Sequence, residues 1–135
     1  MSSEDFSNIV NWKNLADQSL KFKNQKPFSF GFIEDFFDKN FYEKLYKTFP
    51  KIDENWGQRN EMEKTQYYRT WNNIHPDEIN KSGDDANLDE SWNKLKRYAE
   101  SDEFVKHFRD FSGVPVSKCK HIFFMSYKRG GFQLP

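Results

Sequence analysis

The sequence predicts an α+β fold, and three observations support this prediction. Apolar residues recur at helical spacing in four segments of the chain. Phenylalanine alternates with other residues over 28–33, which is typical of a strand. A mostly apolar run over 119–127 predicts another strand. With 135 residues, the chain is expected to form a single domain, 1–135.

Four amphipathic helices are expected. Asp38 is positioned to cap the second helix, Asn87 and Glu90 to form a capping pair in the third, and Ser101 to cap the fourth. Gly113 suits the C-terminal end of the fourth helix, because glycine readily adopts positive φ. The first three helices are predicted over 11–23, 38–49 and 88–99, and the fourth follows Ser101.

The predicted strands differ in character. The strand over 119–127 carries apolar residues on both faces, so we expect both faces to be covered. A short strand is predicted over 67–71, inside an irregular region that extends from 51 to 85. Residues 128–131 predict a turn, and the chain then reads as the start of a further strand.

Composition and charge exclude several classes of protein. The 21 basic residues balance the 21 acidic ones, which argues against a nucleic-acid partner held by phosphate contacts. No apolar run approaches the roughly 20 residues of a membrane span, and the N-terminus does not read as a secretory signal. The single cysteine excludes an internal disulfide framework. We therefore expect a cytoplasmic protein without membrane or nucleic-acid partners.

Three segments, in this order, resemble a known family. Residues 26–37 read Lys-Pro-Phe-Ser-Phe-Gly-Phe-Ile-Glu-Asp-Phe-Phe, and 101–115 run from Ser-Asp-Glu-Phe to Phe-Ser-Gly-Val-Pro. Residues 125–135 read Met-Ser-Tyr-Lys-Arg-Gly-Gly-Phe-Gln-Leu-Pro. Together they resemble the N-terminal half of the 2-oxoglutarate- and Fe(II)-dependent oxygenases, in the prolyl-4-hydroxylase-like branch.

The resemblance implies a fold and a metal site. The fold would consist of N-terminal helices and the first strands of a double-stranded β-helix, or jelly roll. The family's iron site is a 2-His-1-carboxylate triad, whose His-x-Asp would begin directly after Pro135. The sequence therefore looks truncated just before its first metal ligand. Fe(II) and 2-oxoglutarate are expected for the complete hydroxylase, whereas this polypeptide alone is expected to bind neither productively and to be inactive.

Tyr127 is the one site residue that the resemblance carries over. In the family, a tyrosine at this position faces the barrel interior near 2-oxoglutarate, and a phenol can donate a hydrogen bond to a carboxylate. Strand alternation places Tyr127 on the same face as Phe123 and Met125. The alternative is a core tyrosine bonded to backbone.

A second motif has the right residue types in the wrong context. His75-Pro76-Asp77 is a His-x-Asp, with His121 as a possible distal ligand and Arg129 as an anion anchor. Helices are predicted between Asp77 and His121, where the family has barrel strands. We interpret the motif as a chance match, and an independent metalloenzyme built on it as a minor hypothesis.

The remaining chemistry-bearing residues favour structural roles. His107 is expected to be a solvated helix residue, His121 a core histidine and Cys119 a small buried hydrophobe. An acidic cluster lacks the spacing of an EF-hand and is expected to be a solvated loop. The cluster comprises Asp84, Asp85, Asn87 and Asp89.

A second function remains open. The chain can also be interpreted as a complete, non-catalytic interaction module that uses its aromatic surface to self-associate. On either interpretation, the strands over 28–33 and 119–127 would lack partners, so we expect a homo-oligomer, such as a symmetric dimer, that covers them. The sequence leaves the substrate of the complete enzyme open between a small molecule and a protein.

Overall fold

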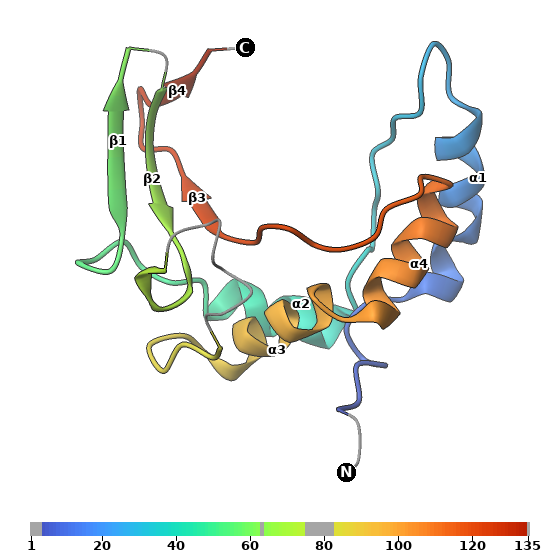
Figure 1. Cartoon of the computed structure of the whole chain (residues 1–135), viewed down its shortest axis with the longest axis horizontal. Coiled ribbons are helices and arrows are strands. Elements are labelled where there is room, and N and C mark those ends of the chain that lie inside the picture. Colours follow the sequence, from blue (N-terminus) through green and yellow to red (C-terminus); the bar gives the residue numbers. More distant parts are fainter. Residues whose placement is uncertain (1–3, 63, 75–82, 135) are drawn as a thin grey trace. The chain divides into compact units, whose positions relative to one another are not determined.

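The computed structural model describes residues 4–62, 64–74 and 83–134 of the chain (Figure 1). Helices and an antiparallel sheet are both present, so the predicted α+β class is confirmed. The chain divides into two compact units, which we describe separately. Unit 1 comprises residues 1–49 and 89–119, and unit 2 comprises 50–88 and 120–135. The prediction of one domain over 1–135 stays a prediction.

The first helix of unit 1 is confirmed, with a tighter first turn. A 3₁₀ turn, η1 (Trp12–Leu15), leads directly into α1 (Ala16–Asn24). Figure 1 shows α1 beside α4 (Asp102–Ser112), and the Ser19 hydroxyl donates a hydrogen bond of 2.6 Å to the Phe111 carbonyl.

Two of the predicted helix caps are found where they were expected. Asp38 accepts hydrogen bonds from the backbone of Asn40 and Phe41 at the start of α2 (Lys39–Lys47). The Ser101 hydroxyl accepts from the Phe104 N–H at 3.2 Å and begins α4. Gly113 ends α4 with a φ of 70°, the left-handed conformation that glycine tolerates.

The predicted capping pair of the third helix is wrong. Helix α3 (Glu90–Ala99) begins after Asp89, which accepts from the backbone N–H and the hydroxyl of Ser91 at 2.9 and 2.6 Å. Asn87 instead donates its own N–H to Asp85. Both Asp and Asn are good caps, and the one that lies next to the helical segment takes the role.

The cap on α3 predicts an acid-sensitive helix end. Hydrogen bonds from the Ser91 hydroxyl and backbone hold the pKa of the Asp89 carboxyl below its ordinary value. A lowered folded-state pKa gives stability that is present above the unfolded pKa, about 3.9, and is lost as pH falls through the folded pKa. We expect Asp89→Ala to lower the free energy of unfolding by about 1 kcal/mol at pH 7. The variant should also no longer lose stability as the pH falls through the folded-state pKa of Asp89. Urea unfolding between pH 2 and 7 measures both effects, and an unchanged pH profile would contradict the assignment.

The core of unit 1 is aromatic. Tyr98 is 2% exposed, and its hydroxyl accepts a 2.7 Å hydrogen bond from Trp12 Nε1. Burial is the main cause that raises the Tyr98 pKa, and the bond from Trp12 opposes it. The buried residues of this core are Ile9, Val10, Leu15, Tyr98 and Phe111.

The strand predicted over 28–33 is wrong, because no strand of the described chain pairs with that segment. Its aromatic side chains are exposed, and Phe32 is 91% accessible. A strand is held by hydrogen bonds to a neighbouring strand, and alternation alone supplies none. The nearby bridge joins Val10 to Phe37 instead.

The sheet of unit 2 is centred on β2 (Lys64–Arg69), which partly confirms the strand predicted over 67–71. An unpredicted partner, β1 (Gly57–Glu61), pairs with β2 antiparallel, with Glu61 opposite Lys64. The other edge of β2 pairs with β3 (Phe124–Ser126) and β4 (Phe132–Gln133), both antiparallel. Figure 1 shows β1, β2 and β3 side by side.

The last predicted strand is shorter than expected. Only β3 of the run over 119–127 is a strand, and Met125 is 45% exposed, so the prediction that both faces are covered is wrong. The predicted turn is confirmed: the Gly131 N–H donates to the Lys128 carbonyl at 2.7 Å, and Gly130 has a φ of 82°. After this turn, β4 pairs with β2. This confirms the prediction that a further strand begins after residue 131.

No helix in the described part of the chain is long and apolar enough to span a membrane.

Candidate functional site

Tyr127 lies directly after β3, at the open face of the sheet. It is 43% exposed, and its hydroxyl lies 3.0 Å from Oε1 of Gln66, to which it donates a hydrogen bond. Gln66 is 3% exposed. The hydroxyl of Tyr127 is therefore bound to a buried amide, while the residue as a whole is exposed. Tyr127 therefore does not lie in the core, as the expected alternative would require.

The register assembles a set of side chains on this face. Tyr68 pairs with Gly57 on one side and Met125 on the other, and Gln66 pairs with Arg59. Because side chains two residues apart point to the same side of a strand, these residues share one face with Tyr127. We call this surface the Tyr127 face; it comprises Gly57, Arg59, Gln66, Tyr68, Met125 and Tyr127.

A glycine makes room for the aromatic ring at the centre of this face. A Cβ on Gly57 would lie 2.4 Å from Cζ of Tyr68, so only glycine lets the ring lie across β1. The Arg59 guanidinium carbon lies 5.3 Å from the centroid of the same ring, a cation–π arrangement. The Tyr127 face therefore presents a cation, an aromatic ring and a phenol.

On the opposite face of the sheet, buried side chains pack against neighbouring segments. Phe124 stacks on Trp71 at 5.0 Å between ring centroids and is 5% exposed. Nη2 of Arg69 lies 3.6 Å from Oδ2 of Asp85, and both side chains are buried. This packing covers the opposite face around Phe124 and Arg69, while Arg59, Met125 and Tyr127 are exposed on the Tyr127 face.

The acidic cluster is not simply a solvated loop. Asp85 is buried and accepts the backbone N–H groups of Asn72 and Asn87, each at 2.8 Å. Its carboxylate, which also faces Arg69, thus connects the segments around Arg69, Asn72 and Asn87. Asp85 has a structural role, while Asp84 is exposed as expected.

The predicted histidine and cysteine environments are corrected in part. His121 is exposed rather than in the core. His107 is half-buried and stacks on Trp12 with ring centroids 5.3 Å apart, so it is not a freely solvated residue. Cys119 is half-buried and lines a small pocket beside Phe104 and Val105.

An iron centre does not fit the described residues. Within residues 4–62, 64–74 and 83–134, no group of three His, Cys, Asp or Glu side chains gathers closely enough to hold a metal ion. His75, Pro76 and Asp77 lie outside the described residues. We therefore assign no chemical step to a metal bound by this part of the chain.

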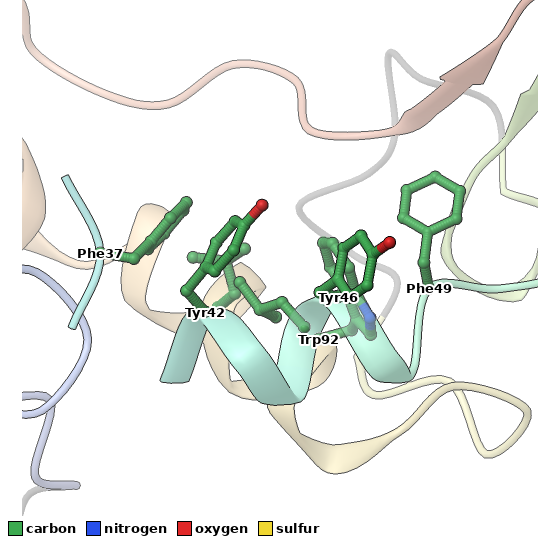
Figure 2. Close-up of a pocket in the computed structure, with 7 residues that line it drawn as sticks. Phe37, Tyr42, Tyr46, Phe49 and Trp92 are labelled. Carbon is green, nitrogen blue, oxygen red and sulfur yellow. The ribbon is translucent and has the colours of Figure 1, made fainter. Parts of the chain in front are cut away.

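Unit 1 carries a separate apolar groove between α2 and α3. Figure 2 shows Tyr42 and Tyr46 on α2 and Phe49 just beyond its end, with Trp92 of α3 beside them. The groove encloses about 460 Å³, and Tyr46 is 74% exposed. Trp92 is anchored by its Nε1, which donates to the Thr48 carbonyl at 3.2 Å. None of the lining side chains is a carboxylate, a histidine or a thiol, so the groove suits apolar binding rather than acid–base chemistry.

The sequence pointed to Tyr127 but to no other member of the Tyr127 face. Gly57, Arg59, Gln66 and Tyr68 come together only through the β1–β2 register. The polar run over 57–61 has no apolar alternation to indicate a strand.

Comparison of the chain with protein-family models, with curated proteins and with solved structures finds no match.

Proposed function

We propose that this chain forms the N-terminal portion of a 2-oxoglutarate- and Fe(II)-dependent oxygenase, a hydroxylase with a jelly-roll domain. The single observation that carries the proposal is the position of Tyr127, which presents a phenol on the accessible face of an antiparallel sheet. The Lys128–Gly131 turn and β4 follow it, in the order of the resembling segments.

The chain's own residues would bind and orient the co-substrate. Tyr127 would move its single hydroxyl hydrogen from Oε1 of Gln66 to a carboxylate oxygen of 2-oxoglutarate, so Gln66 would hold the phenol in place only before binding. Pre-ordering a donor lowers the entropic cost of binding. When bound, the iron and 2-oxoglutarate supply the oxidative chemistry, and the protein supplies binding and orientation.

The test of this proposal is to read the codons that follow Pro135 in the source gene. The proposal expects His-x-Asp directly after it, and a second His with a following Arg or Lys some tens of residues downstream. A stop codon at that point, or a continuation without these residues, would contradict it.

Exposed apolar surface supports a second candidate function, a self-associating interaction module. Phe32 is 91% exposed in the 28–33 segment, and Tyr46 is 74% exposed in the groove of Figure 2. Covering exposed aromatic surface of this kind with a second copy of the chain lowers the free energy of the associated state.

For this candidate, Phe32→Lys and Tyr46→Lys are each expected to shift the mass measured by light scattering from dimer toward monomer, because burying an added charge opposes association. Met62→Lys is the control, since Met62 is 92% exposed but lies in neither surface. A wild-type chain that stays monomeric at high concentration would contradict self-association.

A further inference from the structure

We propose that the Tyr127 face binds a small carboxylic acid, and that Arg59 is the residue that holds its carboxylate. This inference rests on the proposed function and deepens it, because it names a small organic acid as the substrate class.

Arg59 carries the charge that selects such a ligand. Its side chain is exposed, and no carboxylate of the described residues forms an ion pair with it. A planar guanidinium matches a carboxylate in a two-hydrogen-bond geometry. Its charge is therefore available to an anionic ligand that lies on the sheet.

Gly57 and Tyr68 fix the guanidinium in advance. The Tyr68 ring lies across β1 in the space that a side chain at position 57 would fill, and Arg59 stacks on it at 5.3 Å. Stacking on an aromatic ring restricts a long side chain while leaving the edge of the guanidinium for hydrogen bonds. Gly57 is thus a positioning residue for Arg59.

Arg59 and Tyr127 lie on opposite sides of Gln66, across β2. Arg59 is opposite Gln66 across β1 and β2, and Gln66 binds the Tyr127 hydroxyl from the other side. Neighbouring strands lie about 4.8 Å apart, so the backbones of Arg59 and Tyr127 are about 10 Å apart. A small acid held at Arg59 would extend across β2 toward Tyr127, the residue assigned to the co-substrate.

The experiment is an NMR titration of the 135-residue chain with N-acetylglycine, observed at Arg59 Nε and at the side-chain amide of Gln66. We expect saturable shifts in the millimolar range for N-acetylglycine. Its neutral amide, N-acetylglycinamide, and sodium chloride at equal ionic strength are expected to give none.

Variants assign the binding to individual residues. Arg59→Gln is expected to abolish saturation, observed at Gln66, and Gly57→Ala to weaken binding several-fold because it displaces the Tyr68 ring. Arg129→Gln, an exposed arginine in the turn after β3, should bind like the wild-type chain. Circular dichroism verifies that each variant is folded.

Three results would overturn the inference: no saturable shift in the wild-type chain, equal binding by Arg59→Gln, or equal shifts with the neutral amide. Unchanged binding by a folded Gly57→Ala chain would overturn the positioning role of Gly57. Since the titration contains no iron, it separates this inference from the proposed function. Binding without a downstream His-x-Asp would refute only the oxygenase.

Discussion

Phe124→Ala is expected to lower the free energy of unfolding of the sheet unit by about 3–5 kcal/mol, the usual cost of truncating a buried phenylalanine. Phe124 is 5% exposed and lies between Trp71 and Trp56, with ring centroids 5.0 and 6.2 Å away. Removing the ring leaves a cavity between two tryptophans that the rest of the sheet cannot easily fill. Urea unfolding followed by tryptophan fluorescence measures the loss.

Phe32→Ala is the matched control, because the same atoms are removed from a side chain that is 91% exposed. It is expected to change stability by no more than about 0.5 kcal/mol. Equal effects of the two substitutions would mean that Phe124 does not form the packed side of the sheet, and the Tyr127 face would lose its support.

If the proposed function holds, Tyr127→Phe is expected to raise the KM for 2-oxoglutarate about tenfold or more in the complete oxygenase. A hydrogen bond to a charged group contributes about 1.5–3 kcal/mol, and each 1.4 kcal/mol is a factor of ten in affinity. The substitution removes only the hydroxyl, which also leaves Oε1 of the buried Gln66 without the phenol. Initial rates of succinate release at varied 2-oxoglutarate give the KM.

Tyr46→Phe is the control for this measurement. It removes the same hydroxyl from an exposed tyrosine of α2, and the KM should not change. If Tyr127→Phe leaves the KM unchanged as well, Tyr127 does not contact the co-substrate.

The helices were predictable because their determinants are local. Asp38, Ser101 and Gly113 act within a few residues of themselves, and each lies at the helix end that the sequence indicates. The exception is instructive: Asn87 and Asp89 are both good caps, and the position of the first helical turn decided between them.

The strands were harder to predict because pairing is not local. The 28–33 segment alternates well yet has no partner strand in the described chain, whereas the polar β1 is a strand because β2 pairs with it. The edge position of β1 explains its polarity, since charged and polar residues protect an edge strand from unwanted pairing.

The candidate site was predictable only in part, for the same reason. Tyr127 was singled out only by the resemblance of residues 125–135 to the oxygenase family, which depends on sequence order. Arg59 and Gln66 join it through a register across three strands, which no periodicity in a single segment reveals.

The most direct measurement of the central claim is succinate release from 2-oxoglutarate, with Fe(II) and a reductant present. If the proposed function holds, we predict turnover by the complete oxygenase, loss of turnover on chelation of the metal, and no turnover by the 135-residue chain alone. Failure of the longer protein to consume 2-oxoglutarate, with or without candidate acids, would contradict the claim, as would turnover by the 135-residue chain itself.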